Sequence, residues 1–209
     1  AALYAVFVYA PRERTMGDVQ RIFYFHVGTA WNAFLAFFVV FVASVLYLLK
    51  REEAFDRLAG ASAELGVLFT TLVLVTGPLW AKASWGAWWS WDPRLTTTLI
   101  LWFIYLGYLA LRTSIEGDDR RARLASLYGI VAFADVPLVF MAIRWWRTIH
   151  PLIFEGSKTN LEPRMLAALI ISVVAFSSLY LHLLRLRLAT GRLHERLLDL
   201  KERTRGGGF

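Results

Sequence analysis

The longest uncharged stretch of the sequence, Ile22 to Leu49, contains 28 residues without a Lys, Arg, Asp or Glu. As an α-helix with a rise of about 1.5 Å per residue it would extend about 42 Å, more than the ~30 Å hydrocarbon core of a bilayer. Soluble domains interrupt their apolar residues with the period of the helix or strand. The run therefore predicts a membrane-spanning helix and excludes a soluble globular protein.

Other apolar segments extend this prediction along the chain. Four are long enough to cross a bilayer: Ala59 to Ala81, Leu95 to Leu111, Ala125 to Ile143 and Leu166 to Leu184. A sixth, Ala1 to Ala10, is too short, and because the sequence opens without Met we expect it to be the end of a spanning helix whose beginning is missing. No ten-residue alternation typical of a membrane β-barrel occurs. We therefore expect an all-α polytopic membrane protein with six transmembrane helices, the first truncated, in which residues 1–209 form one domain.

The distribution of Lys and Arg predicts the orientation. The segments after Leu49, Leu111 and Leu184 carry 14 of these residues, and the alternate segments 11–21, 82–94 and 144–165 carry 9. By the positive-inside rule the first set is cytoplasmic. This places both termini on the cytoplasmic side of the inner membrane. Residues 185–209 are expected to form an amphipathic, basic cytoplasmic tail that lies on the membrane or faces a partner.

The net charge of +7 does not indicate nucleic-acid binding, because the basic inner segments also contain many acidic residues. The absence of Cys excludes thiol catalysis and Cys-ligated metals. No nucleophile with an adjacent base is visible, so we do not expect the chain to be an enzyme by itself. Asp135, two residues before Pro137, is either a functional intramembrane acid or a hydrogen-bond partner of backbone groups freed by the proline.

Tryptophan is concentrated on the outer side. Seven of the nine Trp lie in or beside outer segments, and four fall within seven residues: Trp85, Trp88, Trp89 and Trp91. One interpretation is an aromatic belt at the membrane interface. A belt should mark both interfaces, whereas the inner loops contain no Trp, so we favour a platform for a flat apolar ligand. Gly86 permits the close approach of another group or a tight turn, and Asp92 followed by Pro93 predicts a helix start.

Two of the four His, His26 and His150, fall on the same outer side and flank the Trp-rich segment. A lone interfacial His is more often hydrogen-bonded or solvated, but two neutral imidazoles on opposite faces can close the axial positions of a haem iron. Propionates could then pair with basic side chains, for which the candidates are Arg94, Arg144 and Arg147. His182 and His194 lie too far along the chain to join this set, and we interpret them as structural or solvated.

The stretch Trp85 to Asp92 resembles the motif Trp-Gly-x-x-Trp-x-Trp-Asp of the tryptophan-rich haem-handling proteins of cytochrome c biogenesis. Chain length, the expected crossings, and the positions of His26 and His150 on either side of this motif are similar to those of the haem exporter protein C family, also called cytochrome c maturation protein C. The resemblance covers nearly the whole chain, including the segments Arg21 to His26 and Trp145 to His150.

The resemblance implies that the protein binds haem b on the periplasmic face and delivers it to a membrane-anchored periplasmic haem chaperone. It also implies a complex with a two-component ABC transporter and a small single-helix membrane subunit. We therefore expect His26 and His150 to be axial ligands, with Asp92 and Arg94 shaping the site. Two alternatives remain: a haem b electron-transfer subunit that interacts with quinone, and a scaffold or permease subunit of an ABC transporter complex. The residues leave open whether haem crosses the bilayer through this chain or reaches it laterally from lipid.

Overall fold

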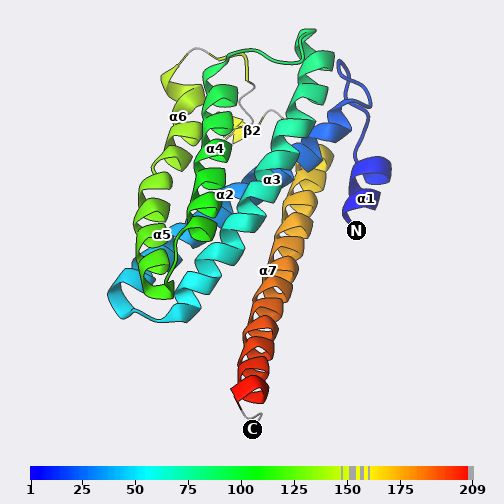
Figure 1. Ribbon diagram of the computed structural model, residues 1–209. Helices are drawn as coiled ribbons and strands as arrows, with labels where there is room; N and C mark the ends of the chain where they lie inside the picture. The colour runs from blue at the N-terminus through cyan, green and yellow to red at the C-terminus, as the bar shows by residue number, and fades with distance from the viewer. Residues whose placement is uncertain (147, 151–153, 156–157, 160, 207–209) are drawn as a thin grey trace.

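The computed structural model describes residues 1–146, 148–150, 154–155, 158–159 and 161–206, and its helices run side by side in a bundle (Figure 1). The long helices are α2 (Gln20–Lys50), α3 (Glu53–Trp85), α4 (Pro93–Ser114), α5 (Asp118–Ala132), α6 (Asp135–Trp145) and α7 (Pro163–Gly206). The short strands β1 (Phe154–Glu155) and β2 (Lys158–Thr159) pair antiparallel between α6 and α7. The all-α class predicted from the sequence is confirmed.

Five helical spans in the described residues are long and apolar enough to cross a membrane, with α5 and α6 together forming one of them. They correspond to the five long apolar segments of the sequence, so the protein is a multi-pass membrane protein. The expected sixth crossing falls on the helical turns α1 (Ala2–Tyr4) and η1 (Ala5–Tyr9). These turns are too short to span a bilayer, so that crossing stays a prediction.

The fourth long apolar segment is interrupted between α5 and α6, at Phe133 and Ala134. Pro137 has no N–H with which to continue the ladder to the Phe133 carbonyl, and Val136 N–H donates to this carbonyl instead, at 3.0 Å. The side chain of Asp135 is 8% exposed and its Oδ2 has no hydrogen-bond partner among the described residues. Of the two alternatives for Asp135, the hydrogen bond to backbone groups freed by the proline is therefore not formed within the described residues.

The main hydrophobic core surrounds α2, which packs along α3 and also contacts α5 and α7. Phe37 of α2 stacks on Tyr105 of α4, with ring centroids 3.6 Å apart, and both side chains are fully buried. Tyr105 shares the buried face of α4 with Leu101 and Tyr108.

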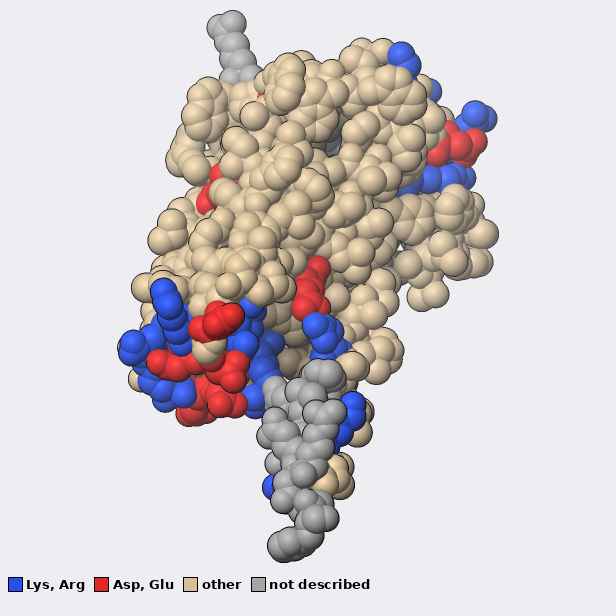
Figure 2. Space-filling view, viewed as in Figure 1, with Lys and Arg blue, Asp and Glu red and all other residues tan. Residues whose placement is uncertain are grey.

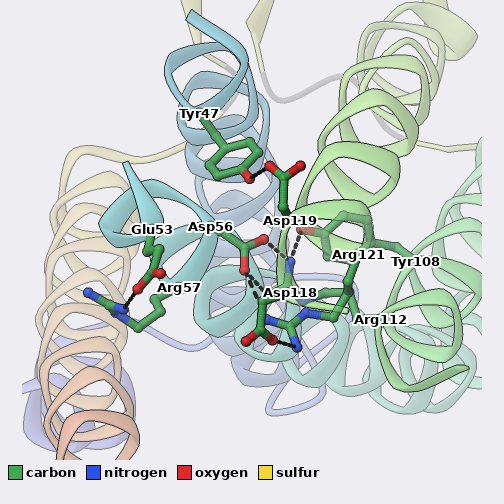
Figure 3. A network of polar contacts seen from close by, with 9 residues as sticks. All are labelled: Tyr47, Glu53, Asp56, Arg57, Tyr108, Arg112, Asp118, Asp119 and Arg121. Atoms are coloured by element: carbon green, nitrogen blue, oxygen red, sulfur yellow. Dashed lines mark hydrogen bonds and ion pairs between the residues drawn. The ribbon is translucent and has the colours of Figure 1, made fainter. Parts of the chain in front are cut away.

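A network of charged side chains joins the α2–α3 turn to the α4–α5 turn (Figure 3). Asp56 of α3 accepts hydrogen bonds from Arg112 of α4 at 2.5 and 2.9 Å, and Arg121 of α5 lies 3.7 Å from the same carboxylate. Tyr47 of α2 donates a hydrogen bond to Asp119 of α5 at 3.2 Å. The network therefore fixes the ends of four helices relative to one another.

Charged side chains gather at the two ends of the bundle, and the face shown in Figure 2 is largely uncharged between them. This is the pattern expected of a protein embedded in lipid. Near one end, Arg187 of α7 pairs with Glu64 of α3 at 2.5 and 2.8 Å. Beyond this pair α7 continues as one helix to Gly206 and extends past the rest of the bundle (Figure 1), and the amphipathic cytoplasmic tail stays a prediction.

Candidate functional site

A cavity of about 230 Å³ opens at the end of the bundle that carries the Trp-rich segment. Side chains of α2, α3, α4 and α6 form its walls, and residues of the two connecting segments α3–α4 and α6–α7 complete it. The lining is mostly apolar, with few polar groups: His26, Thr70, Arg94, Thr98, Arg144 and His150. A concave apolar site with a small number of polar groups is typical of a small-molecule or cofactor site.

His26 lies on α2, and its ring lines the cavity from that side. Its Nδ1 is 2.9 Å from the hydroxyl oxygen of Thr76 on α3. His150 lines the same cavity from the segment between α6 and α7. The structure therefore brings these two imidazoles to one cavity on one side of the bundle.

Asp92 connects the two outer segments of the site. As the N-cap of α4, its Oδ1 accepts from Arg94 N–H at 3.0 Å, which confirms the predicted helix start with Pro93 in the first turn. Its Oδ2 accepts from the Thr148 hydroxyl at 2.6 Å and from Ile149 N–H at 3.0 Å. The Thr148 hydroxyl oxygen in turn accepts from His150 N–H at 3.0 Å. Asp92 does not line the cavity, but it holds the backbone that carries His150.

The structure divides the predicted Trp platform. Trp85 and Trp89 line the cavity, and Trp85 packs edge-on against His150 with ring centroids 6.3 Å apart. Trp88 and Trp91 are 56% and 77% exposed and are not among the lining residues. The backbone turns at Gly86, which has a φ of 75° and ends α3, as predicted for a tight turn at this glycine. Two of the four indoles therefore line the cavity, and Trp91 packs edge-on against Trp89 with ring centroids 5.8 Å apart.

Two of the three predicted propionate partners, Arg94 and Arg144, line the cavity. The guanidinium of Arg94 makes no hydrogen bond or ion pair with any residue that the structure describes. Arg144 lies over the ring of Phe140, 5.6 Å from its centroid. The third, Arg147, lies outside the described residues.

Comparison with known protein families shows the family to which the chain belongs. The family model of heme exporter protein C matches residues 1–202. The chain belongs to the heme exporter protein C family.

Individual relatives agree with this assignment to the heme exporter protein C family. Heme exporter protein C of Bradyrhizobium diazoefficiens is 33% identical over 200 residues, which cover 94% of this chain and 76% of the relative. Heme exporter protein C of Rhodobacter capsulatus is 34% identical over 206 residues, with 95% and 84% covered. A putative cytochrome c biosynthesis ccmC-like mitochondrial protein of Marchantia polymorpha is 34% identical over 176 residues, with 84% and 75% covered.

Some residues of the site in this member of the heme exporter protein C family escaped the sequence prediction. Trp31 of α2 and Trp80 of α3 also line the cavity, and Trp80 packs edge-on against Trp85 with ring centroids 5.4 Å apart. Trp80 could have been included, because it lies one helical turn and a half before the predicted platform. No pattern in the sequence indicates the contact of Thr76 with His26, because this contact depends on the register between two helices.

Proposed function

We propose that this protein binds haem in the outer cavity and transfers it to a partner during cytochrome c maturation. The observation that carries this proposal is that His26 and His150 line one mostly apolar cavity from different elements. Axial ligation of haem requires two donors that approach one iron from opposite faces of a flat apolar ring. Membership of the heme exporter protein C family supports haem as the ligand.

The donor set fits a haem better than a bare metal ion. No group of three or more His, Cys, Asp or Glu that could hold a metal ion occurs in the described part of the chain. Two imidazoles are a sufficient protein contribution when a macrocycle supplies the equatorial nitrogen ligands. The haem that we propose is haem b, which is held without covalent attachment to the chain.

Charge complementarity also supports haem. Arg94 lines an apolar cavity without a hydrogen-bonded partner among the described side chains, and a cation in such surroundings is costly unless it is paired. A propionate carboxylate would supply the missing partner through a charge-assisted hydrogen bond. Arg144 is the second proposed propionate partner, and Trp85 and Trp89 are the indoles against which the porphyrin would pack.

The release of haem would depend on the different structural elements that carry the two His residues. His26 lies inside a long helix, whereas His150 lies on the segment that connects α6 and α7. We propose that His150 leaves the iron first when a periplasmic, membrane-anchored haem chaperone offers its own ligand, while His26, the indoles and the arginines hold the ring. Trp88 and Trp91 are exposed, which supports the proposal that they contact that chaperone.

The proposed setting is the inner membrane, with the cavity on the periplasmic side and both termini in the cytoplasm. The basic surplus of the opposite end supports this orientation. A two-component ABC transporter and a small single-helix subunit are the other proposed partners, and α7 beyond Arg187 extends far enough to meet a cytoplasmic component.

The test is to measure haem absorbance of the purified protein and haem loading of the chaperone in cells. We expect His26→Ala and His150→Ala each to disturb the spectrum and to reduce loading at least tenfold. His182→Ala is the matched control, because His182 does not line the cavity, and it should leave both unchanged. Normal loading in the double variant would refute the proposal. A haem that titrates with quinol turnover would favour an electron-transfer subunit instead.

A further inference from the structure

We propose that Thr76 is a positioning residue for haem ligation: its hydroxyl holds His26 in the tautomer that presents Nε2 to the iron. This inference rests on the proposed function, since it concerns how one of the two proposed ligands is prepared. It names a side chain that neither lines the cavity nor would touch haem.

The Thr76 hydroxyl lies within hydrogen-bond distance of two groups. It lies 2.7 Å from the Leu72 carbonyl, four residues earlier in α3, and 2.9 Å from Nδ1 of His26. A hydroxyl has one proton to donate and can accept further bonds. Because the Leu72 carbonyl can only accept, the Thr76 proton goes to it.

The state of the imidazole follows from this geometry. With its proton committed to Leu72, the Thr76 oxygen accepts from His26, so Nδ1 carries the proton. In a neutral imidazole the other nitrogen, Nε2, then has the free lone pair that a metal requires. Among the described residues, Nε2 of His26 has no hydrogen-bond partner that would compete for this lone pair.

The orientation of the ring is fixed by the next residue of α3. A Cβ placed on Gly77 would lie 3.2 Å from Cε1 of His26 and 3.8 Å from its Nδ1. The Nδ1 edge of the ring therefore packs directly against the backbone of α3, and any side chain at position 77 would crowd it. Thr76 and Gly77 together turn this edge toward α3 and leave Nε2 for the cavity that His26 lines.

The hydrogen bond to Thr76 should change how strongly His26 binds iron. A hydrogen bond from the ring N–H of a ligating His fixes its orientation and makes the other nitrogen a stronger donor. Loss of such a bond typically costs about 10- to 100-fold in affinity. A stronger donor also favours ferric over ferrous iron, so the same bond should lower the reduction potential of the bound haem.

The experiment compares three variants of the full-length protein titrated with ferric haem. Thr76→Val keeps the shape and removes the hydroxyl, and Thr76→Ser restores the hydroxyl. Thr71→Val is the matched control, because Thr71 lies on the same helix and its hydroxyl bonds to Val67 and Trp102, away from the cavity. The readouts are haem affinity, the reduction potential and, in the haem-free protein, the ¹⁵N chemical shifts of His26 assigned by its loss in His26→Ala.

We expect haem to bind at least tenfold more weakly to Thr76→Val and its potential to rise, while Thr76→Ser and Thr71→Val resemble the unmodified protein. The ¹⁵N spectrum of the unmodified protein should show His26 protonated at Nδ1, a readout that does not depend on Thr76→Val folding. Protonation at Nε2, or unchanged affinity and potential in a folded Thr76→Val, would overturn the inference. If His26→Ala itself keeps the haem spectrum intact, the proposed function fails and not merely the role of Thr76.

Discussion

Asp92 is the residue on which the geometry of both outer segments depends. It is 8% exposed, caps α4 with one carboxylate oxygen and holds the α6–α7 segment with the other. An ionised carboxylate can accept all of these bonds, whereas an amide has only one accepting oxygen. The aspartate therefore cannot be replaced by its closest isostere without losing a connection.

We expect Asp92→Asn to weaken haem binding about tenfold while leaving the helices intact. Loss of one hydrogen bond to a charged group costs about 1.5–3 kcal/mol, which releases the backbone of Ile149 and thereby displaces His150. Hydrogen–deuterium exchange should accelerate about tenfold at Ile149 N–H.

The control for Asp92→Asn is Asp18→Asn, which removes an acid of the same outer side whose carboxylate is 61% exposed and pairs with Arg12 and Arg21. It should alter neither exchange at Ile149 nor haem binding. Unchanged exchange in Asp92→Asn would mean that the carboxylate does not position His150.

For single residues, sequence patterns predict which side chains belong to the site better than they predict which side chains touch one another. The pairing of His26 with His150 could be proposed from the side of the membrane on which each falls, and both line the cavity. The sequence could not predict that Trp85 lines the cavity while Trp91 is exposed, because this difference depends on the path of an irregular segment. The contact of Thr76 with His26 could not be predicted either, because packing along the whole interface sets the register of α3 against α2.

Between helices, the pair of Asp56 and Arg112 is a buried, bidentate connection at the end of the bundle that carries the charged network of Figure 3. The side chains are 7% and 15% exposed, and the contact is bidentate. Removing one partner of a buried pair leaves an uncompensated charge, which costs about 3–5 kcal/mol. The exposed pair of Arg57 with Glu53 on α3 offers a contrast, because its carboxylate is 82% exposed.

We expect Asp56→Ala to lower the free energy of unfolding by about 3 kcal/mol, because Arg112 loses its buried partner. Glu53→Ala, the matched control, should cost less than about 0.5 kcal/mol because exposed pairs contribute little. Unfolding of the purified protein in detergent, followed by circular dichroism, measures both. Equal effects of the two substitutions would show that burial of Asp56 does not determine its contribution.

At the element scale, the apolar segments predicted the spanning helices well, since lipid requires every backbone polar group to be paired within the segment. The ends were less accurate: α3 begins at Glu53 and continues through Pro78 to Trp85. The sequence predicted backbone groups freed by Pro137, and the interruption lies at Phe133, four residues before this proline.

In the molecule as a whole, the segments with more Lys and Arg lie at one end of the bundle and the Trp-rich segment lies at the other. This difference between the two ends predicts an orientation in the membrane. The end with the charged network of Figure 3 is proposed to face the cytoplasm, and the end with the cavity the periplasm. The orientation is open to a direct test because the chain contains no Cys. A single introduced thiol therefore reports the side on which its segment lies.

We expect Ala87→Cys, on the exposed α3–α4 segment, to react with a membrane-impermeant maleimide in intact spheroplasts. Ser114→Cys, at the exposed end of α4, should react only after the membrane is permeabilised, because the basic segments are retained inside. The unmodified Cys-free chain is the control for background labelling. The reverse pattern would invert the proposed orientation and place the cavity in the cytoplasm.

Electron paramagnetic resonance of the ferric haem complex tests whether His26 and His150 hold one haem iron. The unmodified protein should give the low-spin signal of an iron with two imidazole ligands. His26→Gly and His150→Gly should each give a high-spin signal that returns to low spin when free imidazole is added. A low-spin signal unchanged in both single variants would contradict the account.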